Sequence, residues 1–511
     1  MGKQTGECRA ERILPDLWRF RDTCNVYVFN FAGRGIAVDF GSGKWLKQLP
    51  SIGVSRLEHV FLTHHHPDQC SGLLRRKSWP FTIHAPGGED RFLAPEALRQ
   101  YYRSMDGLDY TPYCMQSTIP RGISNIAYDI CGNTEMALRG HCFRFVLTPG
   151  HGPNALSIIV EHNGTHLAFC GDAAHAGATI WEPFQLEWDH WTGKGALAAW
   201  EGIMRLAAVG MDLLCPAHGP LIAARPRKVL LKTAGRLMDF YRAKGSICAG
   251  EKDHFAIGAP AAGGAIKILP HLYRVRNSYL VVSRSNKGLI VDPTVGEIEI
   301  MEALLKELKC LKPDAAIVSH YHLDHCDGIP HFQRKYGLKA WLHPRVAERM
   351  SSAGKGYVIY RSRLPVRPDC LLPQQGIWRW QEYDFAVAPW PGQTWWHAVY
   401  QARIDGKKVL FGGDSFQPSS RWNGTGGFCA LNNSRFREGF IPSARLALRW
   451  CPDIVASGHG CTYHFTSSRF RRIIAWARSA DRALRALCPS GDPEKDYYAV
   501  LRGEHASRGR T

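Results

Sequence analysis

Short apolar runs, broken by glycine, asparagine and charged residues, recur along the chain and predict many short β-strands. The pattern is clear at 17–20 (LWRF), 25–31 (NVYVFNF) and 35–40 (GIAVDF), and it returns at 272–275 (LYRV) and 288–291 (GLIV). These runs are rich in β-branched and aromatic residues, which pack well on a pleated sheet. We therefore expect sheets to form the centre of the structure.

Longer segments carry apolar residues three or four positions apart, and this spacing predicts helices between the strands. The clearest are 195–209, 227–244, 297–308 and 467–487. The segment 79–139 shows no sustained period, and we expect helices and loops there. Strands that alternate with helices indicate the α/β or α+β class.

One apolar run, AAIV at 315–318, leads directly into the segment SHYHLDHCDG at 319–328, which is rich in metal-ligating side chains. Two histidines two positions apart at the end of a strand point to the same side, so both can reach one ion. A carboxylate and an imidazole where the chain then turns can bind a second ion nearby. The candidate ligands are His320, His322, Asp324 and His325.

An earlier segment, THHHPDQCSG at 63–72, follows the apolar run VFL in the same way. It repeats the pattern with His64, His66 and Asp68, but Gln69 stands where the later segment has its last histidine. The chain thus contains one complete and one incomplete copy of the same ligand pattern.

Further apolar strands end at polar residues that can also bind a metal. In the first half these residues are His151, Asp172 and His218. The corresponding positions of the second half hold Gln393, Asp414 and His459. Together with Asp39 and Asp292, five landmarks recur in the same order about 250 positions later, which indicates duplication of one domain.

The length of 511 residues suits two such domains. A segment rich in glycine, alanine and proline, ending at 270, has the composition of a linker. We predict a first domain at 8–248, a linker at 249–270, a second domain at 271–488 and a loose polar tail at 489–511.

The composition, with 45% hydrophobic and 21% charged residues, is that of a globular protein. No apolar run approaches the roughly 18 residues that a membrane helix needs. The polar N-terminus lacks the apolar core of a signal peptide. The 16 cysteines show no disulfide or zinc-finger spacing. We therefore expect a cytoplasmic protein that is not bound to a membrane.

The formal net charge of +19 favours anionic partners, and an anionic small molecule is among the expected substrates. The lysines and arginines are dispersed, without a dense basic run, which argues against a nucleic acid as partner but does not exclude it.

Both halves resemble the metallo-β-lactamase superfamily. Its signature HxHxDH is complete in the second half at 320–325 and lacks its final histidine in the first at 64–69. The later landmarks, a histidine in a PGH turn, an aspartate in a GD turn and a final histidine before glycine, also occur. This resemblance implies two tandem αβ/βα sandwiches, each with a site for two metal ions at one edge of its paired sheets.

The resemblance also implies which residues hold which ion. In the first half, one ion would take His64, His66, His151 and the bridging Asp172, whereas the other would have Asp68, Asp172 and His218 but Gln69 in place of a histidine. The second half is the mirror case. There one ion would take Asp324, His325, Asp414 and His459, and the other would have His320 and His322 but Gln393.

The expected cofactor is Zn²⁺, one or two ions per domain, with iron or manganese as alternatives. The resemblance implies a metal-dependent hydrolase of a small ester, lactone, thioester or amide, which uses a metal-activated water. Asp68 and Asp324 would orient the nucleophile or bind the second ion, and one complete site per half would permit mononuclear chemistry. His65 and Tyr321, in the middle of each HxH, are expected to point away from the metal.

Three alternatives stay open. The first is a nuclease similar to ribonuclease Z, with one degenerate half. The second is a non-catalytic binding or scaffold protein, and the third is a non-haem iron dioxygenase, since histidines with one carboxylate also suit Fe(II). The sequence also leaves open whether Gln69, Gln393 or His397 contributes to ligation.

Overall fold

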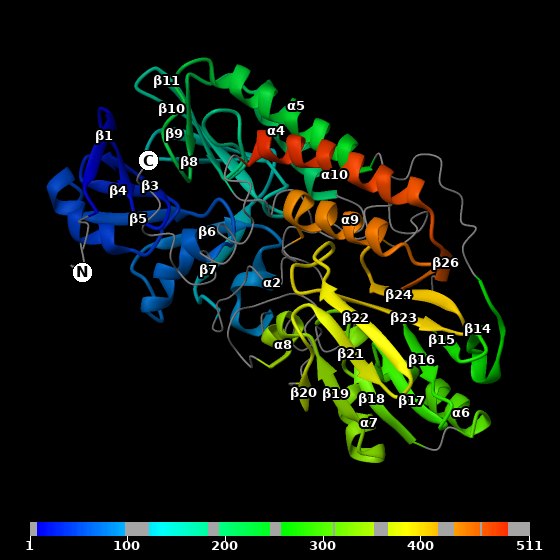
Figure 1. The fold of residues 1–511 in the computed structure, drawn as a ribbon. Helices are drawn as coiled ribbons and strands as arrows, with labels where there is room; N and C mark the ends of the chain where they lie inside the picture. Colours follow the sequence, from blue (N-terminus) through cyan, green and yellow to red (C-terminus); the bar gives the residue numbers. More distant parts are fainter. Residues whose placement is uncertain are drawn as a thin grey trace, which may run out of the picture. The chain divides into compact units, whose positions relative to one another are not determined.

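The computed structural model describes residues 8–97, 122–181, 194–245, 257–309, 312–351, 366–416, 434–459 and 462–488. The chain divides into two compact units (Figure 1). Unit 1 comprises Met1–Asp189, Gly193–Tyr241 and Ala483–Thr511, and unit 2 comprises His190–Thr192 and Arg242–Arg482.

Unit 1 contains two sheets whose strands follow one another in chain order. The first sheet is antiparallel from β1 to β4 and parallel from β4 to β7. Its strands are β1 (Ala10–Leu14), β2 (Leu17–Arg21), β3 (Asn25–Phe31), β4 (Arg34–Val38), β5 (Arg56–Phe61), β6 (Thr82–Pro86) and β7 (Ile126–Ile130). The second sheet has the order β12-β11-β10-β9-β8, with strands β8 (Thr134–Leu138), β9 (His141–Leu147), β10 (Leu156–His162), β11 (Thr165–Gly171) and β12 (Leu213–Pro216).

The two sheets of unit 1 pack face to face through an apolar core. Phe29 and Phe61 from the first sheet contact Phe143 from the second, with ring centroids 5.9 and 5.3 Å apart. The opposite face of the first sheet is covered by a second cluster that includes Trp45 of the helix η1 (Lys44–Ile52). Burial of both faces explains why these strands read as nearly continuous apolar runs.

Unit 2 repeats this arrangement with an eight-stranded and a six-stranded sheet. The first contains β13 (Ala259–Pro260), β14 (Ile266–Leu269), β15 (Leu272–Val275), β16 (Ser278–Val282), β17 (Lys287–Val291), β18 (Lys312–Ile317), β19 (Lys339–Leu342) and β20 (Cys370–Leu371). The second contains β21 (Gly376–Trp380), β22 (Tyr383–Pro389), β23 (Ala398–Ile404), β24 (Lys407–Gly413), β25 (Ile454–Ser457) and β26 (Thr462–His464). Tyr279 and Phe411 meet between the sheets, with ring centroids 5.7 Å apart.

The predicted helices are confirmed. The four longest expected segments form α4 (Lys194–Ala208), α5 (Pro226–Gly245), α6 (Ile298–Glu307) and α10 (Ser467–Leu487). Among the described residues, the other α-helices of eight or more residues are α7 (Ile329–Tyr336), α8 (Pro344–Ser351) and α9 (Ile441–Trp450). The short helices are α1 (Pro67–Cys70), η2 (Ser71–Arg75), α2 (Asp90–Leu93), η6 (Ala262–Gly264), η7 (Val295–Glu297), η8 (Leu323–His325) and the π-helical η10 (Phe436–Phe440).

The prediction of helices and loops for 79–139 was wrong for three short stretches, which form β6, β7 and β8, whereas 98–121 lies outside the described residues. These strands escape pattern reading because β6 places the buried polar residue His84 inside its five-residue run, and β8 is largely exposed. Part of the segment proposed as a linker forms β13 and β14 in the first sheet of unit 2. The segment 246–256 and the tail at 489–511 lie outside the described residues.

The tandem architecture and the α/β class are as predicted: each unit pairs two mixed sheets with helices. The described part of the chain contains no helix that is both long and apolar enough to span a bilayer.

Candidate metal centres

The first ligand segment starts where β5 ends, and a short chain of hydrogen bonds sets its first histidine. The backbone N–H and the hydroxyl of Thr63 donate to Asp39 Oδ1, both at 2.9 Å. The Thr63 hydroxyl also lies 3.0 Å from His64 Nδ1, and because it donates its own hydrogen to Asp39 it accepts a hydrogen bond from the N–H at this nitrogen. His64 Nε2, which is buried without a hydrogen-bond partner, is thereby left as a lone pair that can bind an ion.

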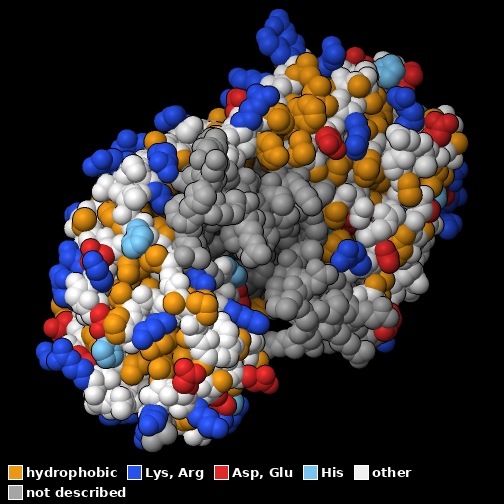
Figure 2. Space-filling model, turned by 90° about the vertical axis from the view of Figure 1, so that its right-hand side faces the viewer, with side chains coloured by type: hydrophobic (Ala, Val, Ile, Leu, Met, Phe, Trp, Pro, Cys, Tyr) orange, Lys and Arg blue, Asp and Glu red, His pale blue; other side chains and the backbone are white. Residues whose placement is uncertain are grey.

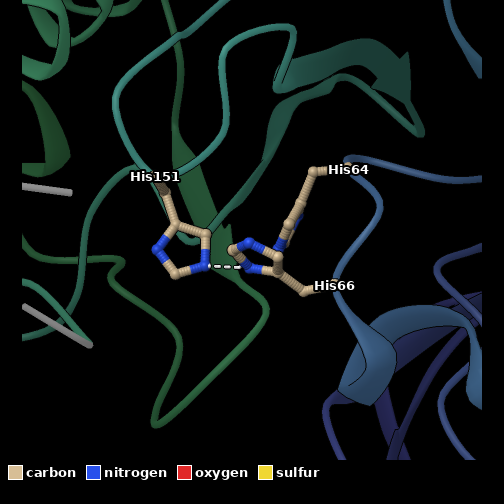
Figure 3. Close-up of side chains that lie close together, drawn as sticks. All are labelled: His64, His66 and His151. Atoms are coloured by element: carbon tan, nitrogen blue, oxygen red, sulfur yellow. Dashed lines mark hydrogen bonds between the residues drawn. The ribbon is translucent and has the colours of Figure 1, made fainter. Parts of the chain in front are cut away.

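Three histidines of unit 1 converge beside this loop (Figure 3). His66 Nδ1 lies 2.6 Å from His151 Nε2, and one nitrogen from each of His64, His66 and His151 lies within 4.8 Å of the others. His151 follows β9 in the second sheet, whereas the other two histidines follow β5 in the first. The two sheets of unit 1 therefore meet at this candidate centre.

A second ligand group lies next to the first. His218 lies between two carboxylates and donates to both, from Nδ1 to Asp172 Oδ1 at 2.7 Å and from Nε2 to Asp68 Oδ2 at 3.1 Å. The other oxygen of Asp172, Oδ2, lies 3.3 Å from His151 Nε2 and 3.6 Å from His64 Nε2. Asp172 thus faces both groups, as the sequence predicted for a bridging ligand.

Gln69 occupies the remaining corner of the second group and is fully buried. Its amide Nε2 donates to Asp172 Oδ2 at 3.2 Å and to Asp68 Oδ2 at 3.3 Å. A carboxylate can only accept a hydrogen bond, so the amide must present its nitrogen and not its oxygen to this pair.

Burial and charge give the histidines of unit 1 two different protonation preferences. Burial holds the pKa of His64 and of His151 well below the ordinary histidine value, so both are neutral at pH 7. Burial also opposes protonation of His218, but the Asp172 and Asp68 carboxylates outweigh it and raise the pKa of His218 well above that value. His64 and His151 therefore offer neutral imidazoles, and the second group is an ion pair.

In unit 2, an aspartate and a hydroxyl hold His320 in the same way. Ser319 donates to Asp292, from N to Oδ1 at 2.6 Å and from Oγ to Oδ2 at 2.7 Å, and Ser319 Oγ lies 3.0 Å from His320 Nδ1. Asp292, like Asp39, adopts a left-handed backbone conformation, with φ of 55° and 58° respectively. Aspartate tolerates the left-handed region better than most residues do.

The complete ligand group of unit 2 surrounds Asp414. His325 Nε2 lies 3.1 Å from Asp414 Oδ1, and His459 Nε2 lies 3.0 Å from Asp414 Oδ2. Asp324 Oδ2 lies 3.4 Å from the same nitrogen of His459. The structure brings together two overlapping sets of three, namely Asp324, His325 and His459, and His320, His325 and Asp414.

Gln393 of unit 2 is buried and donates from Nε2 to Asp414 Oδ2 at 3.0 Å. His397 does not join either ligand set among the described residues; its ring stacks on His320 with centroids 4.7 Å apart. Burial lowers the pKa of His397 to about 3. His322 is also absent from those sets and lies beside His320, with ring centroids 4.4 Å apart.

The residues around the centres pack as the sequence suggested. His65 Nδ1 contacts Glu89 Oε2, and its ring stacks on Phe92 with centroids 4.2 Å apart, away from the ligand group. Trp181 lies parallel to the His218 ring at 4.2 Å and forms an aromatic wall of the first centre.

Sequence reasoning gave Asp39 and Asp292 only as repeat landmarks and overlooked Thr63 and Ser319. Their role in setting the histidine tautomer depends on hydrogen bonds between strands. A hydroxyl directly before each HxH, with an aspartate at the end of the preceding strand, is the signal that would have identified them.

The donor set fits a transition metal. Imidazole and carboxylate are the ligands of zinc and of non-haem iron, and the three histidines are buried with one nitrogen of each close to the others. An aspartate and a hydroxyl hold the ring nitrogen of His64 and of His320 that faces away from the candidate ion, as hydrogen bonds to metal-binding histidines usually do.

A model of the metallo-beta-lactamase superfamily matches residues 19–225 and 273–459. A metallo-beta-lactamase family protein from Thermus thermophilus is 19% identical, over 47% of this chain and 85% of its own, with a TM-score of 0.36. An archaeal superfamily protein from Sulfolobus tokodaii is 15% identical, over 56% and 93%, with a TM-score of 0.31. A Cronobacter sakazakii metallo-beta-lactamase with a HARLDQ motif is 16% identical, over 41% and 78%, with a TM-score of 0.32. No curated protein matches the chain.

Proposed function

The chain belongs to the metallo-β-lactamase superfamily, matched twice along its length, and on that premise we propose that it is a metal-dependent hydrolase of a small ester, lactone, thioester or amide. The observation that carries the proposal is the convergence of the buried side chains of His64, His66 and His151 beside the carboxylate of Asp172. We further propose Zn²⁺ as the native ion.

A bound ion would lower the pKa of a coordinated water towards about 7 and so provide hydroxide at neutral pH. The protein's own contribution is to hold the ligands and to exclude bulk water. Asp39 and Thr63 keep the proton of His64 on Nδ1, which aims Nε2 at the site. Asp172 offers one oxygen to each ligand group.

Asp68 is the residue of unit 1 best placed to orient an attacking water. It is partly exposed, unlike Asp172, and its Oδ2 is held by His218 and Gln69 at 3.1 and 3.3 Å. Asp324 has the equivalent place in unit 2, with its Oδ2 3.4 Å from His459. We propose that both carboxylates serve as positioning or proton-accepting groups.

The way in which the positive charges are distributed does not favour the nuclease alternative. On the face shown in Figure 2, lysine and arginine side chains are interspersed with acidic and apolar ones and do not gather into one stripe. The charge pattern of this face therefore agrees better with a small-molecule substrate than with a polyanion.

The test is metal content, measured by elemental mass spectrometry on the full chain and on two paired variants, His64→Ala/His66→Ala and Asp324→Ala/His325→Ala. We expect each pair to remove the ion of its own unit and to abolish or lower hydrolysis of thioester, lactone and ester probes by at least about 100-fold in that unit. A matched control is His65→Gln, whose ring faces Glu89 instead of the ligands. A chain that holds no metal would overturn the proposal.

A further inference from the structure

Both departures from the family ligand pattern place a glutamine amide on the bridging aspartate. Gln69 is 0% exposed and donates to Asp172 Oδ2 at 3.2 Å. Gln393 is 1% exposed and donates to Asp414 Oδ2 at 3.0 Å. The same contact therefore occurs in both units, although the two glutamines stand at different positions of the ligand pattern.

The two amides reach the aspartates from different elements. Gln69 belongs to α1, which follows the HxH segment in the first sheet, whereas Gln393 lies in the loop between β22 and β23 of the second sheet. Each amide thus approaches a different ion position: in unit 1 that of the Asp68 group, and in unit 2 that of the HxH group. Two independent chance losses of a ligand would not be expected to produce the same amide–aspartate hydrogen bond in both units.

An amide N–H₂ group directed at a carboxylate oxygen has an electrostatic effect similar to that of a cation at the same place, but it cannot bind a metal. The nitrogen has no available lone pair and presents its hydrogens to the site. In unit 1 the amide also occupies an acceptor position of Asp68 Oδ2, at 3.3 Å, which an ion in the Asp68 group would need. A metal at that position would have to break a buried hydrogen bond to a charged group, which is a costly change.

The other members of each incomplete group are held by contacts within the protein. In unit 1, His218 bonds to Asp172 and Asp68 at 2.7 and 3.1 Å. In unit 2, His320 bonds to Ser319 and stacks on His397. His320 Nε2 is nevertheless buried without a hydrogen-bond partner, so in unit 2 it is the amide of Gln393 that distinguishes the incomplete position from the three-histidine group of unit 1.

We propose that Gln69 and Gln393 each take the place of one ion, so that the chain binds two ions rather than four, at non-equivalent positions. Unit 1 holds its ion on three histidines, and unit 2 holds its ion on Asp324, His325 and His459. The inference rests on the proposed metal dependence and adds the number of ions, their positions and the two residues that determine them.

The experiment is metal titration of the full chain with Zn²⁺ and with Co²⁺, read by elemental analysis and by the visible absorption of bound Co²⁺. We expect two equivalents in the wild type, three in Gln69→His, three in Gln393→His and four in the double variant. Gln69→Met and Gln393→Met are matched controls, because they remove the amide without adding a ligand, and they are expected to stay at two.

The Co²⁺ spectrum separates the two positions. In Asp324→Ala/His325→Ala the remaining absorption should be that of a nitrogen-rich site, and in His64→Ala/His66→Ala that of a mixed nitrogen–oxygen site. Four equivalents in the wild type would overturn the inference and leave the hydrolase proposal intact, whereas no bound metal would overturn both. The number of ions bound by the wild-type chain is sufficient to overturn the inference, so the test does not depend on whether every variant folds.

Discussion

At the scale of single residues, the ligand atoms depend on buried neighbours that fix their tautomers. The hydroxyls of Thr63 and Ser319 do this in the two units, each bonded to an aspartate at a strand end. The sequence pointed to the candidate ligands because histidines and carboxylates at HxHxDH spacing have few other uses, and most of them converge in the structure. It did not identify the hydroxyls, because threonine and serine are common in loops and their role depends on a partner about 25 residues away.

Thr63→Val tests this positioning role. Valine keeps the shape of threonine but cannot bond to Asp39 or to His64 Nδ1, so the lone pair of His64 is no longer held towards the site. We expect a roughly 10- to 100-fold weaker affinity of unit 1 for Zn²⁺, with the ion of unit 2 unaffected. Competition with a chromogenic chelator would measure it, and Thr63→Ser should restore wild-type affinity. An unchanged affinity in the valine variant would contradict the role.

A second residue-scale prediction concerns His59 of β5, which lies outside the metal centre. Its Nδ1 contacts His84 Nε2 at 3.0 Å, and His84 Nδ1 in turn contacts Asp129 at 2.8 Å. Partial burial, reinforced by His84, lowers the pKa of His59 despite the Glu58 carboxylate. The unfolded chain therefore takes up a proton first, as the pH falls through about 6.5, and this part of the stability is present above that pH and lost below it.

His59→Gln removes this proton uptake. The free energy of unfolding of the variant should fall less than that of the wild type between about pH 7.5 and about pH 5, although the effect is small because the ring is partly exposed. Urea denaturation at both pH values measures the difference. Equal losses in the two proteins would show that His59 does not contribute.

At the scale of elements, helix α5 shows why periodic segments were predictable. Leu230, Ala234, Leu237 and Phe240 recur every three or four positions and are all buried. Strands β6 and β8 were missed because a short strand gives few positions on which a period can be read, and His84 and the exposed β8 residues conceal it.

Two substitutions on α5 test its orientation. Leu237 is 0% exposed and Leu231 is 40% exposed, and both can be changed to alanine within the same helix. We expect Leu237→Ala to lower the free energy of unfolding by about 2–5 kcal/mol, because it leaves a cavity. Leu231→Ala should cost about 1 kcal/mol or less. Similar losses in both variants, measured by urea denaturation, would contradict the assigned face.

At the scale of the whole molecule, both the domain duplication and the family could be recognised from ordered landmarks, since five motifs in sequence are more specific than any one of them. The family match over 19–225 and 273–459 confirms that recognition. The substrate could not be predicted, because it depends on loops around each centre, and the sequence of a loop does not determine its shape.

Removal of metal should destabilise the protein if both ions bind only the folded state. At a free ion concentration of 100 to 1,000 times the dissociation constant, each ion adds about 3–4 kcal/mol to the unit that holds it. Dialysis against a chelator should therefore lower the midpoint of thermal unfolding, and added Zn²⁺ should restore it. A midpoint that does not respond to chelator or to Zn²⁺ would contradict tight binding in either unit.

The paired supports behind His64 and His320 have a consequence for how the protein can be studied. An aspartate, a hydroxyl and an imidazole are hydrogen-bonded in the same way in both units, so each unit can serve as an internal control for the other. A spectroscopic or kinetic difference between the units can then be traced to the few side chains that differ around the ions. Exchanging those side chains between the halves would show which of them sets the reactivity, with no second protein required.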